Sequence, residues 1–144
     1  MKAPAAAQSV VDFYQALSPA SLQQIEQLYA PTVRFKDPFN EVEGIAAVRA
    51  IFEHMFRQLH APRFVVTACV AQGAEAFLTW RFDFRFRDHA PQVTQTILGA
   101  THLRFDADGR VVWHRDYWDA AEELYEKLPW VGGLMRWLKR RVNA

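Results

Sequence analysis

Apolar residues in the first 62 positions recur every three or four residues, which is the spacing of amphipathic helices. This spacing predicts a first helix over residues 5–17. Ser18-Pro19 suits the start of a second helix, with Ser as N-cap and Pro at the first helical position, and Pro31 ends it. Gly44 then opens a longer third helix, which Pro62 ends. The pattern therefore predicts three helices before residue 63.

Elsewhere the apolar residues alternate with polar ones, which is the spacing of a strand with one buried face. A short strand is predicted at residues 33–37, and longer ones at residues 63–71, 75–88, 92–105 and 110–118. In the strand 75–88 the dry face consists of Leu78, Trp80, Phe82, Phe84 and Phe86. The opposite face carries Thr79, Arg81, Asp83, Arg85 and Arg87.

This order of elements predicts an α+β fold in one domain spanning residues 1–144. Three N-terminal helices would pack on a curved, mostly antiparallel sheet, giving a cone with a central pocket at its wide end. A short helix is expected near residues 120–127.

Residues 128–144 are predicted to form a basic amphipathic helix. Its cations are Arg136, Lys139, Arg140 and Arg141. Such a helix with Trp at its edge can lie on an anionic membrane, which would give a weak membrane contact. The alternative, which we favour, is a helix that caps the cone or docks on the sheet.

Composition narrows the functional classes. Hydrophobic residues make up 51% of the chain and aromatic residues 14%, enough to build a core and line a cavity. The net charge of +1 gives no reason to expect a nucleic-acid partner. No signal peptide or membrane-spanning run is recognisable, and the single cysteine, Cys69, fits a reducing compartment, so a cytoplasmic location is expected. Cys69 itself is expected to be a small buried hydrophobe rather than a nucleophile.

No sequence pattern points to a cofactor. His54, His60, His89 and His102 have no metal-ligand spacing with one another or with Cys69, so no metal is expected. A Gly-rich phosphate loop and a nucleophile elbow are both missing from the sequence.

Asp37 is the strongest candidate for chemistry. It follows the predicted strand 33–37 and lies between Phe35 and Phe39. If this segment is buried, loss of water would raise the pKa of its carboxyl group, which suits a general base or acid near neutrality. The alternative is a solvated Asp-Pro turn.

Several motifs in this order resemble the nuclear-transport-factor-2-like superfamily, and within it the ketosteroid isomerase and SnoaL-like polyketide cyclase branches. The likeness covers roughly residues 8–120. The segments that carry it are residues 10–14 (VVDFY), 35–38 (FKDP), 44–48 (GIAAV), 101–105 (THLRF) and 114–118 (HRDYW).

The resemblance implies roles for particular residues. Asp37 matches the isomerase Asp that moves a proton beside a carbonyl, and Tyr14 matches the Tyr that donates to the enolate oxygen. Thr101 stands where the isomerases have a protonated Asp, so it would be a weaker donor, and this departure argues against true steroid isomerisation. Asp116 resembles the acid/base Asp of the cyclases, with His114 on the same strand face.

The resemblance also implies a substrate pocket and an assembly. The expected substrate-binding residues are Phe52, Phe56, Trp80, Phe82, Leu103 and Trp118. A homodimer is expected through the charged face of residues 79–87, because related folds commonly pair through the sheet.

The sequence therefore favours an isomerase- or cyclase-like enzyme that acts by acid/base chemistry on a hydrophobic carbonyl compound. A binding protein that holds a small hydrophobic ligand without chemistry is the alternative, since fold does not fix function. A third possibility is an interaction protein that uses the outer sheet face and the tail.

Overall fold

The computed structural model describes residues 3–88, 90–123, 137 and 140–141. The helical elements are α1 (Ala3–Gln15), the 3₁₀ helix η1 (Ala20–Gln24), α2 (Ile25–Leu28), α3 (Ile45–Gln58) and α4 (Ala120–Glu123). The strands are β1 (Tyr29–Lys36), β2 (Glu41–Glu43), β3 (Leu59–Gln72), β4 (Glu75–Phe86), β5 (Gln95–Phe105) and β6 (Val111–Tyr117). They form one sheet in the order β2-β1-β6-β5-β4-β3. Only β1 and β6 pair in parallel among these neighbours, and every other pair is antiparallel.

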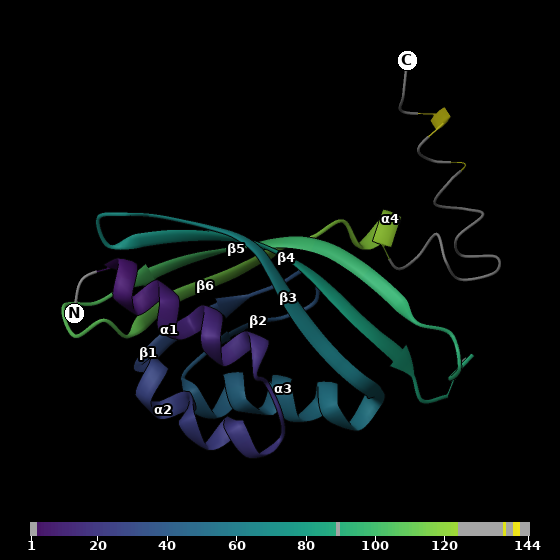
Figure 1. Cartoon of the computed structure of the whole chain (residues 1–144), viewed down its shortest axis with the longest axis horizontal. Helices are drawn as coiled ribbons and strands as arrows, with labels where there is room; N and C mark the ends of the chain where they lie inside the picture. Colours follow the sequence, from purple (N-terminus) through teal and green to yellow (C-terminus); the bar gives the residue numbers. More distant parts are fainter. Residues whose placement is uncertain (1–2, 89, 124–136, 138–139, 142–144) are drawn as a thin grey trace.

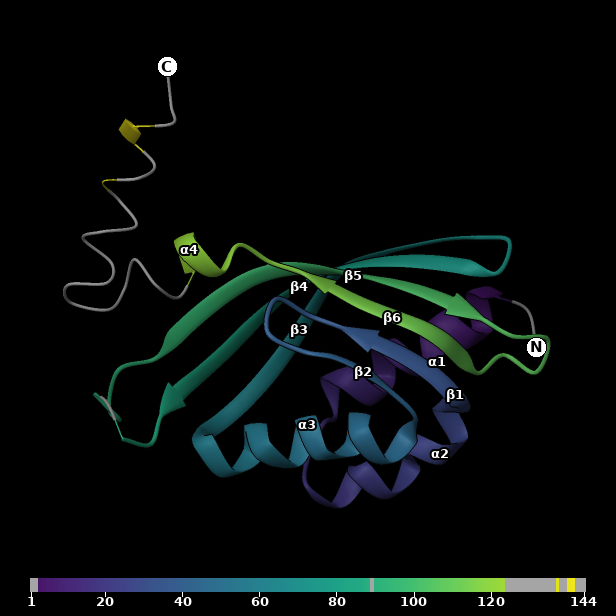
Figure 2. The ribbon, with the colours of Figure 1, turned by 180° about the vertical axis from the view of Figure 1, so that it is seen from behind.

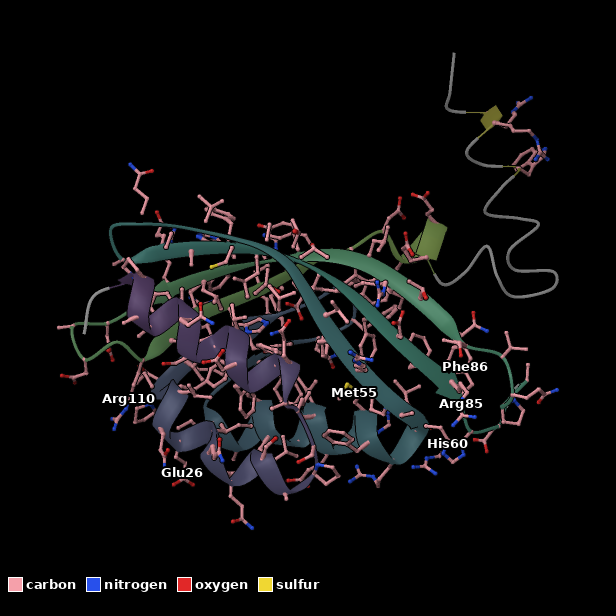
Figure 3. All side chains as sticks on the ribbon, in the orientation of Figure 1. Glu26, Met55, His60, Arg85, Phe86 and Arg110 are labelled. Carbon is pink, nitrogen blue, oxygen red and sulfur yellow. The ribbon has the colours of Figure 1, made fainter. Side chains whose placement is uncertain are left out.

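The sheet arches over α1, α2 and α3, which lie on its concave side. Figure 1 shows α1, α2 and α3 together beneath the sheet, and the reverse view shows the same layering (Figure 2). Met55 points from α3 toward the sheet, whereas Glu26 points away from it (Figure 3). This arrangement confirms the predicted α+β cone with helices on one face of a curved sheet.

The dry face predicted for residues 75–88 is confirmed in β4. Leu78, Trp80, Phe82 and Phe84 are buried, while the residues between them are exposed or half-buried. Alternation predicted this strand well because one face meets the core and the other meets water.

The second predicted helix is the main difference. It is divided into η1 and the single turn of α2, and β1 begins at Tyr29, so Pro31 lies inside a strand rather than ending a helix. The strand tolerates proline there because the pairing of β1 with β6 shifts register between Tyr29 and Arg34.

A similar extension occurs at β3, which begins at Leu59 and includes Pro62. Ala61 has a positive φ of 49°, and the pairing with β4 shifts register between His60 and Arg63. A bulge on an edge strand accommodates a residue that has no N–H to donate. The short strand β2 was not predicted.

Cys69 corrects another expectation. It is exposed on β3, not buried. Because β3 is the edge strand of the sheet, its segment 67–70 remains open to solvent.

The predicted tail helix over residues 128–144 lies largely outside the described residues. Of its described members, Trp137 is exposed and the Arg141 guanidinium lies 5.5 Å from the centre of its ring. No helix within the described part of the chain is both long and apolar enough to cross a membrane.

Candidate functional site

A cavity of about 270 Å³ lies between α3 and the concave face of the sheet. Nine aromatic side chains of the described residues line it: Phe35, Phe39, Phe52, Phe64, Trp80, Phe82, Phe84, Phe86 and Trp118. The polar side chains in the lining are Asp37, Asn40, His54, Gln58 and Asp116. The cavity is therefore apolar along its walls, with a few polar groups that could orient a ligand.

Strand register brings the polar groups of this site together. Thr101 on β5 lies directly opposite Asp116 on β6. Because side chains two residues apart share a strand face, His114 and Asp116 both point to the concave side. Phe35 on β1 lies opposite His114 and its ring centre is 4.6 Å from the imidazole.

Asp116 accepts two hydrogen bonds on one oxygen. The Thr101 hydroxyl donates to its Oδ1 at 2.6 Å, and His114 Nε2 lies 2.7 Å from the same oxygen. Trp80 Nε1 donates to the Thr101 hydroxyl oxygen at 2.8 Å. Among the described residues no donor bonds Oδ2, so one carboxylate oxygen is fixed and the other is left for a ligand.

His114 is fully buried and joins Asp116 to two tyrosines. The hydroxyls of Tyr29 and Tyr14 lie 2.9 Å and 3.3 Å from His114 Nδ1, and 2.7 Å from each other. If Nε2 carries its proton toward the carboxylate, a neutral imidazole must accept at Nδ1. Tyr29 then donates to His114 and Tyr14 donates to Tyr29. The hydrogen bonds therefore run in one direction, from Tyr14 through Tyr29 and His114 to the Asp116 carboxylate.

Both tyrosines are held in the neutral phenol form. Burial raises the pKa of Tyr14 well above its ordinary value, with further increases from the neighbouring Tyr29 and the Asp116 carboxylate. Burial is also the main cause of the raised pKa of Tyr29; the nearby Asp116 charge adds to it, whereas the hydrogen bond with Tyr14 opposes it. These hydroxyls are therefore hydrogen-bond donors at physiological pH.

The position of the Trp80 indole depends on Gly99. These residues are directly opposite in the β4–β5 pair, and a Cβ atom at Gly99 would lie only 2.4 Å from the Trp80 ring. Glycine thus lets the indole lie flat over β5, where its N–H reaches Thr101.

Asp37 borders the same cavity from the loop after β1 and is half-buried. Its Oδ1 accepts from the backbone N–H groups of Phe39 at 2.8 Å and Asn40 at 2.6 Å. The Asn40 side-chain amide donates to both of its oxygens at 3.1 Å. The carboxylate therefore stabilises its own turn and also borders the cavity, next to the end of β6 that carries Asp116, because Lys36 and Arg115 pair directly before the two carboxylates.

The remaining predicted residues divide into two groups. Phe52, Trp80, Phe82 and Trp118 line the main cavity, but Phe56 and Leu103 are not part of its lining. Leu103 is fully buried in the core, and Phe56 packs against that core from α3.

Tyr14 and Thr101 instead border a much smaller cavity of about 10 Å³, which shares Phe64, Trp80 and Asp116 with the main one. Their hydroxyls are bonded to protein partners, so neither reaches the main cavity as a donor in this conformation.

Sequence reasoning did not find four of the polar residues here: Tyr29, Asn40, His54 and Gln58. Gln58 follows His54 by four positions, about one helical turn, so both lie on one face of α3, where they line the cavity. Over the described ranges, no group of three or more His, Cys, Asp or Glu side chains is placed to hold a metal ion.

Comparison with protein families gives a match to the SnoaL-like domain over residues 10–114. The chain belongs to the SnoaL-like domain family. This match includes Tyr14, Asp37, Thr101 and His114, and ends two residues before Asp116. A comparison with curated proteins gives no match.

Solved structures repeat the fold at low sequence identity. A hypothetical protein with a ketosteroid isomerase-like fold from Catenulispora acidiphila DSM 44928, in complex with trimethylamine, aligns with a TM-score of 0.70 and 15% identity, covering 84% of this chain and 90% of that one. A predicted SnoaL-like polyketide cyclase from Shewanella denitrificans OS-217 aligns with a TM-score of 0.69 and 18% identity, covering 84% and 97%.

An epoxide hydrolase of the LEH-like type from M. tuberculosis aligns with a TM-score of 0.70 and 16% identity, covering 97% of this chain and 96% of that one. At these identities the structural likeness shows the fold of this SnoaL-like protein alone.

Proposed function

We propose that this SnoaL-like protein is an acid/base enzyme of the isomerase or cyclase type, which acts on a hydrophobic, enolisable carbonyl compound. The observation that carries the proposal is Asp116. One of its oxygens is fixed by Thr101 and His114, while the other accepts no hydrogen bond from the described residues, and Asp116 borders an aromatic-lined cavity.

In this proposal Asp116 Oδ2 removes a proton from the carbon beside the carbonyl and returns it to another carbon. A base must lie within hydrogen-bond reach of the proton it takes, and a fixed carboxylate on a rigid strand meets that requirement for a ligand in the cavity. His114 holds the carboxylate in place, and the two tyrosines hold His114 in the required tautomer.

Asp37 is the second acid/base group. The resemblance gives it the leading role, but four hydrogen bonds from its own turn occupy it, so we assign the first proton transfer to Asp116. The carbonyl oxygen would meet a neutral donor in the lining, the side-chain amide of Gln58.

The experiment measures deuterium incorporation beside the carbonyl of 1-tetralone in D₂O by NMR. We expect the wild-type protein to accelerate exchange and Asp116→Asn to lose about 100-fold or more of that acceleration, the contribution typical of a general base. Asp83→Asn is the matched control, because Asp83 lies on the opposite sheet face, where it binds Arg81 and Thr96.

The same series separates the two carboxylates. A larger loss in Asp37→Asn than in Asp116→Asn would give Asp37 the leading role. Exchange that neither substitution changes, together with ligand binding in the cavity, would support the non-catalytic binding protein instead.

A further inference from the structure

The described residues that line the cavity carry carboxylates but no lysine or arginine. The carboxylates are those of Asp37 and Asp116. Neither carboxylate pairs with a lysine or arginine within the described ranges. Their partners are N–H groups, a hydroxyl and an imidazole.

The nearest cations in the sequence point away from the cavity. Lys36 and Arg115 each precede one of the carboxylates, and strand alternation turns their side chains to the other face of the sheet. Lys36 Nζ lies 3.7 Å from Glu41, and the Arg115 guanidinium lies 4.4 Å from the centre of the Tyr117 ring.

These two cations line a second, open depression at the ends of β1 and β6, which shares Asp37, Asp116 and Trp118 with the main cavity. Around the main cavity, α3 contributes only His54 as a titratable group, and Arg87, just beyond β4, donates to the Phe56 carbonyl. No fixed cation of these elements therefore neutralises the carboxylates on the cavity side.

We infer that the cavity selects a ring compound whose polar end is a protonated or quaternary amine, and that it rejects the same ring bearing a carboxylate. An anion entering the site would meet two carboxylates and lose its water without gaining a cationic partner. A cation would gain both carboxylates and the faces of the surrounding rings, to which ammonium groups are attracted.

This inference deepens the proposed function, on which it rests for the location of the ligand. It names the substrate as an amine-bearing hydrophobic compound. Its test is a binding measurement, so it does not depend on turnover.

Three probes with one ring system supply the test. They are the 2-naphthylmethyl-trimethylammonium cation, the neutral alcohol 2-naphthylmethanol, and the carboxylate anion of 2-naphthylacetic acid. Their dissociation constants would be measured by isothermal titration calorimetry at pH 8. We expect the ammonium probe to bind at least about tenfold more tightly than the alcohol, which is about 1.4 kcal/mol, and the carboxylate probe to bind most weakly.

Asp116→Asn and Asp37→Asn should each narrow the gap between the ammonium and carboxylate probes while leaving the affinity for the alcohol within about threefold. Unchanged alcohol binding shows that the variant cavity is intact. Asp83→Asn, on the outer sheet face, should leave all three affinities unchanged.

Equal affinity for the ammonium and carboxylate probes, a gap that neither substitution alters, or no binding of any probe would overturn the inference. Tetralone exchange that persists in that case leaves the proposed function standing. The reverse result is also possible. If the three probes bind in the expected order but the protein does not accelerate deuterium exchange of 1-tetralone, the charge selectivity holds and the proposed chemistry fails.

Discussion

The hydrogen-bond partners of the Thr101 hydroxyl determine its role in the site. By resemblance it would donate to a substrate oxygen. In the structure its only proton goes to Asp116 Oδ1, and its oxygen accepts the indole N–H of Trp80. A threonine hydroxyl has one donor, so it cannot serve a ligand while it holds Asp116.

We therefore expect Thr101→Val to lower the free energy of unfolding by about 1–3 kcal/mol, because the buried Trp80 N–H loses its acceptor. Tetralone exchange should fall as well, because Asp116 loses one of the two bonds that orient it. Thr101→Ser keeps the hydroxyl and should restore both properties toward wild type. Urea unfolding and the exchange assay measure the two effects, and a Ser variant as impaired as Val would contradict the hydrogen-bonding role.

The two buried tyrosines predict how stability depends on pH. The pKa of each is raised in the folded protein above the ordinary value of about 10. The unfolded chain then releases these protons first, so the stabilisation is complete below about pH 10 and is lost as the pH rises toward the folded-state values.

Urea unfolding between pH 9 and pH 11 should show this loss, with a slope of up to about 1.4 kcal/mol per pH unit for each tyrosine. Tyr29→Phe should make the free energy of unfolding depend less steeply on pH, because only one of the two buried tyrosines then remains. Equal slopes in wild type and Tyr29→Phe would contradict the assignment.

At the scale of elements, the sequence predicted the strands best where one face is wet. Alternation in β4 identified each buried residue from Leu78 to Phe84 because the helices cover only that side. The same logic placed His114 and Asp116 on one face of β6. Pro31 and Pro62 misled the prediction, because bulges and register shifts let both lie within strands.

The parts of the site that the sequence did not predict come from contacts between distant elements. Tyr29 continues the apolar stripe of the predicted second helix, so its hydroxyl gives no local signal of the bond to His114, 85 residues away. His54 and Gln58 lie at the edge of the apolar stripe of α3, where a polar residue usually meets solvent. Only the curvature of the sheet brings them to a cavity.

At the scale of the whole molecule, α1, α2 and α3 leave the outer face of the sheet uncovered (Figures 1 and 2). The short helix α4 contacts this side at β5, where Glu123 accepts from the Leu98 N–H at 3.4 Å. Side chains on this face include the exposed Phe77, Leu98 and Tyr117. Charged groups flank them in pairs of opposite sign: Arg81 with Asp83, and Arg104 with Glu75, each at 3.0 Å. Apolar residues among paired charges can meet their own copies across a two-fold axis.

We predict a homodimer through this face. Sedimentation equilibrium at micromolar concentration should give twice the 16.6 kDa mass of one chain. Leu98→Lys places a like charge from each copy at the interface and should shift the protein to monomer. Val93→Lys is the matched control, since Val93 is also exposed but lies in the loop between β4 and β5. A wild-type protein that sediments as a monomer would exclude the dimer, and the cavity would then act within a single chain. A Leu98→Lys variant that remains dimeric would place the interface on another surface.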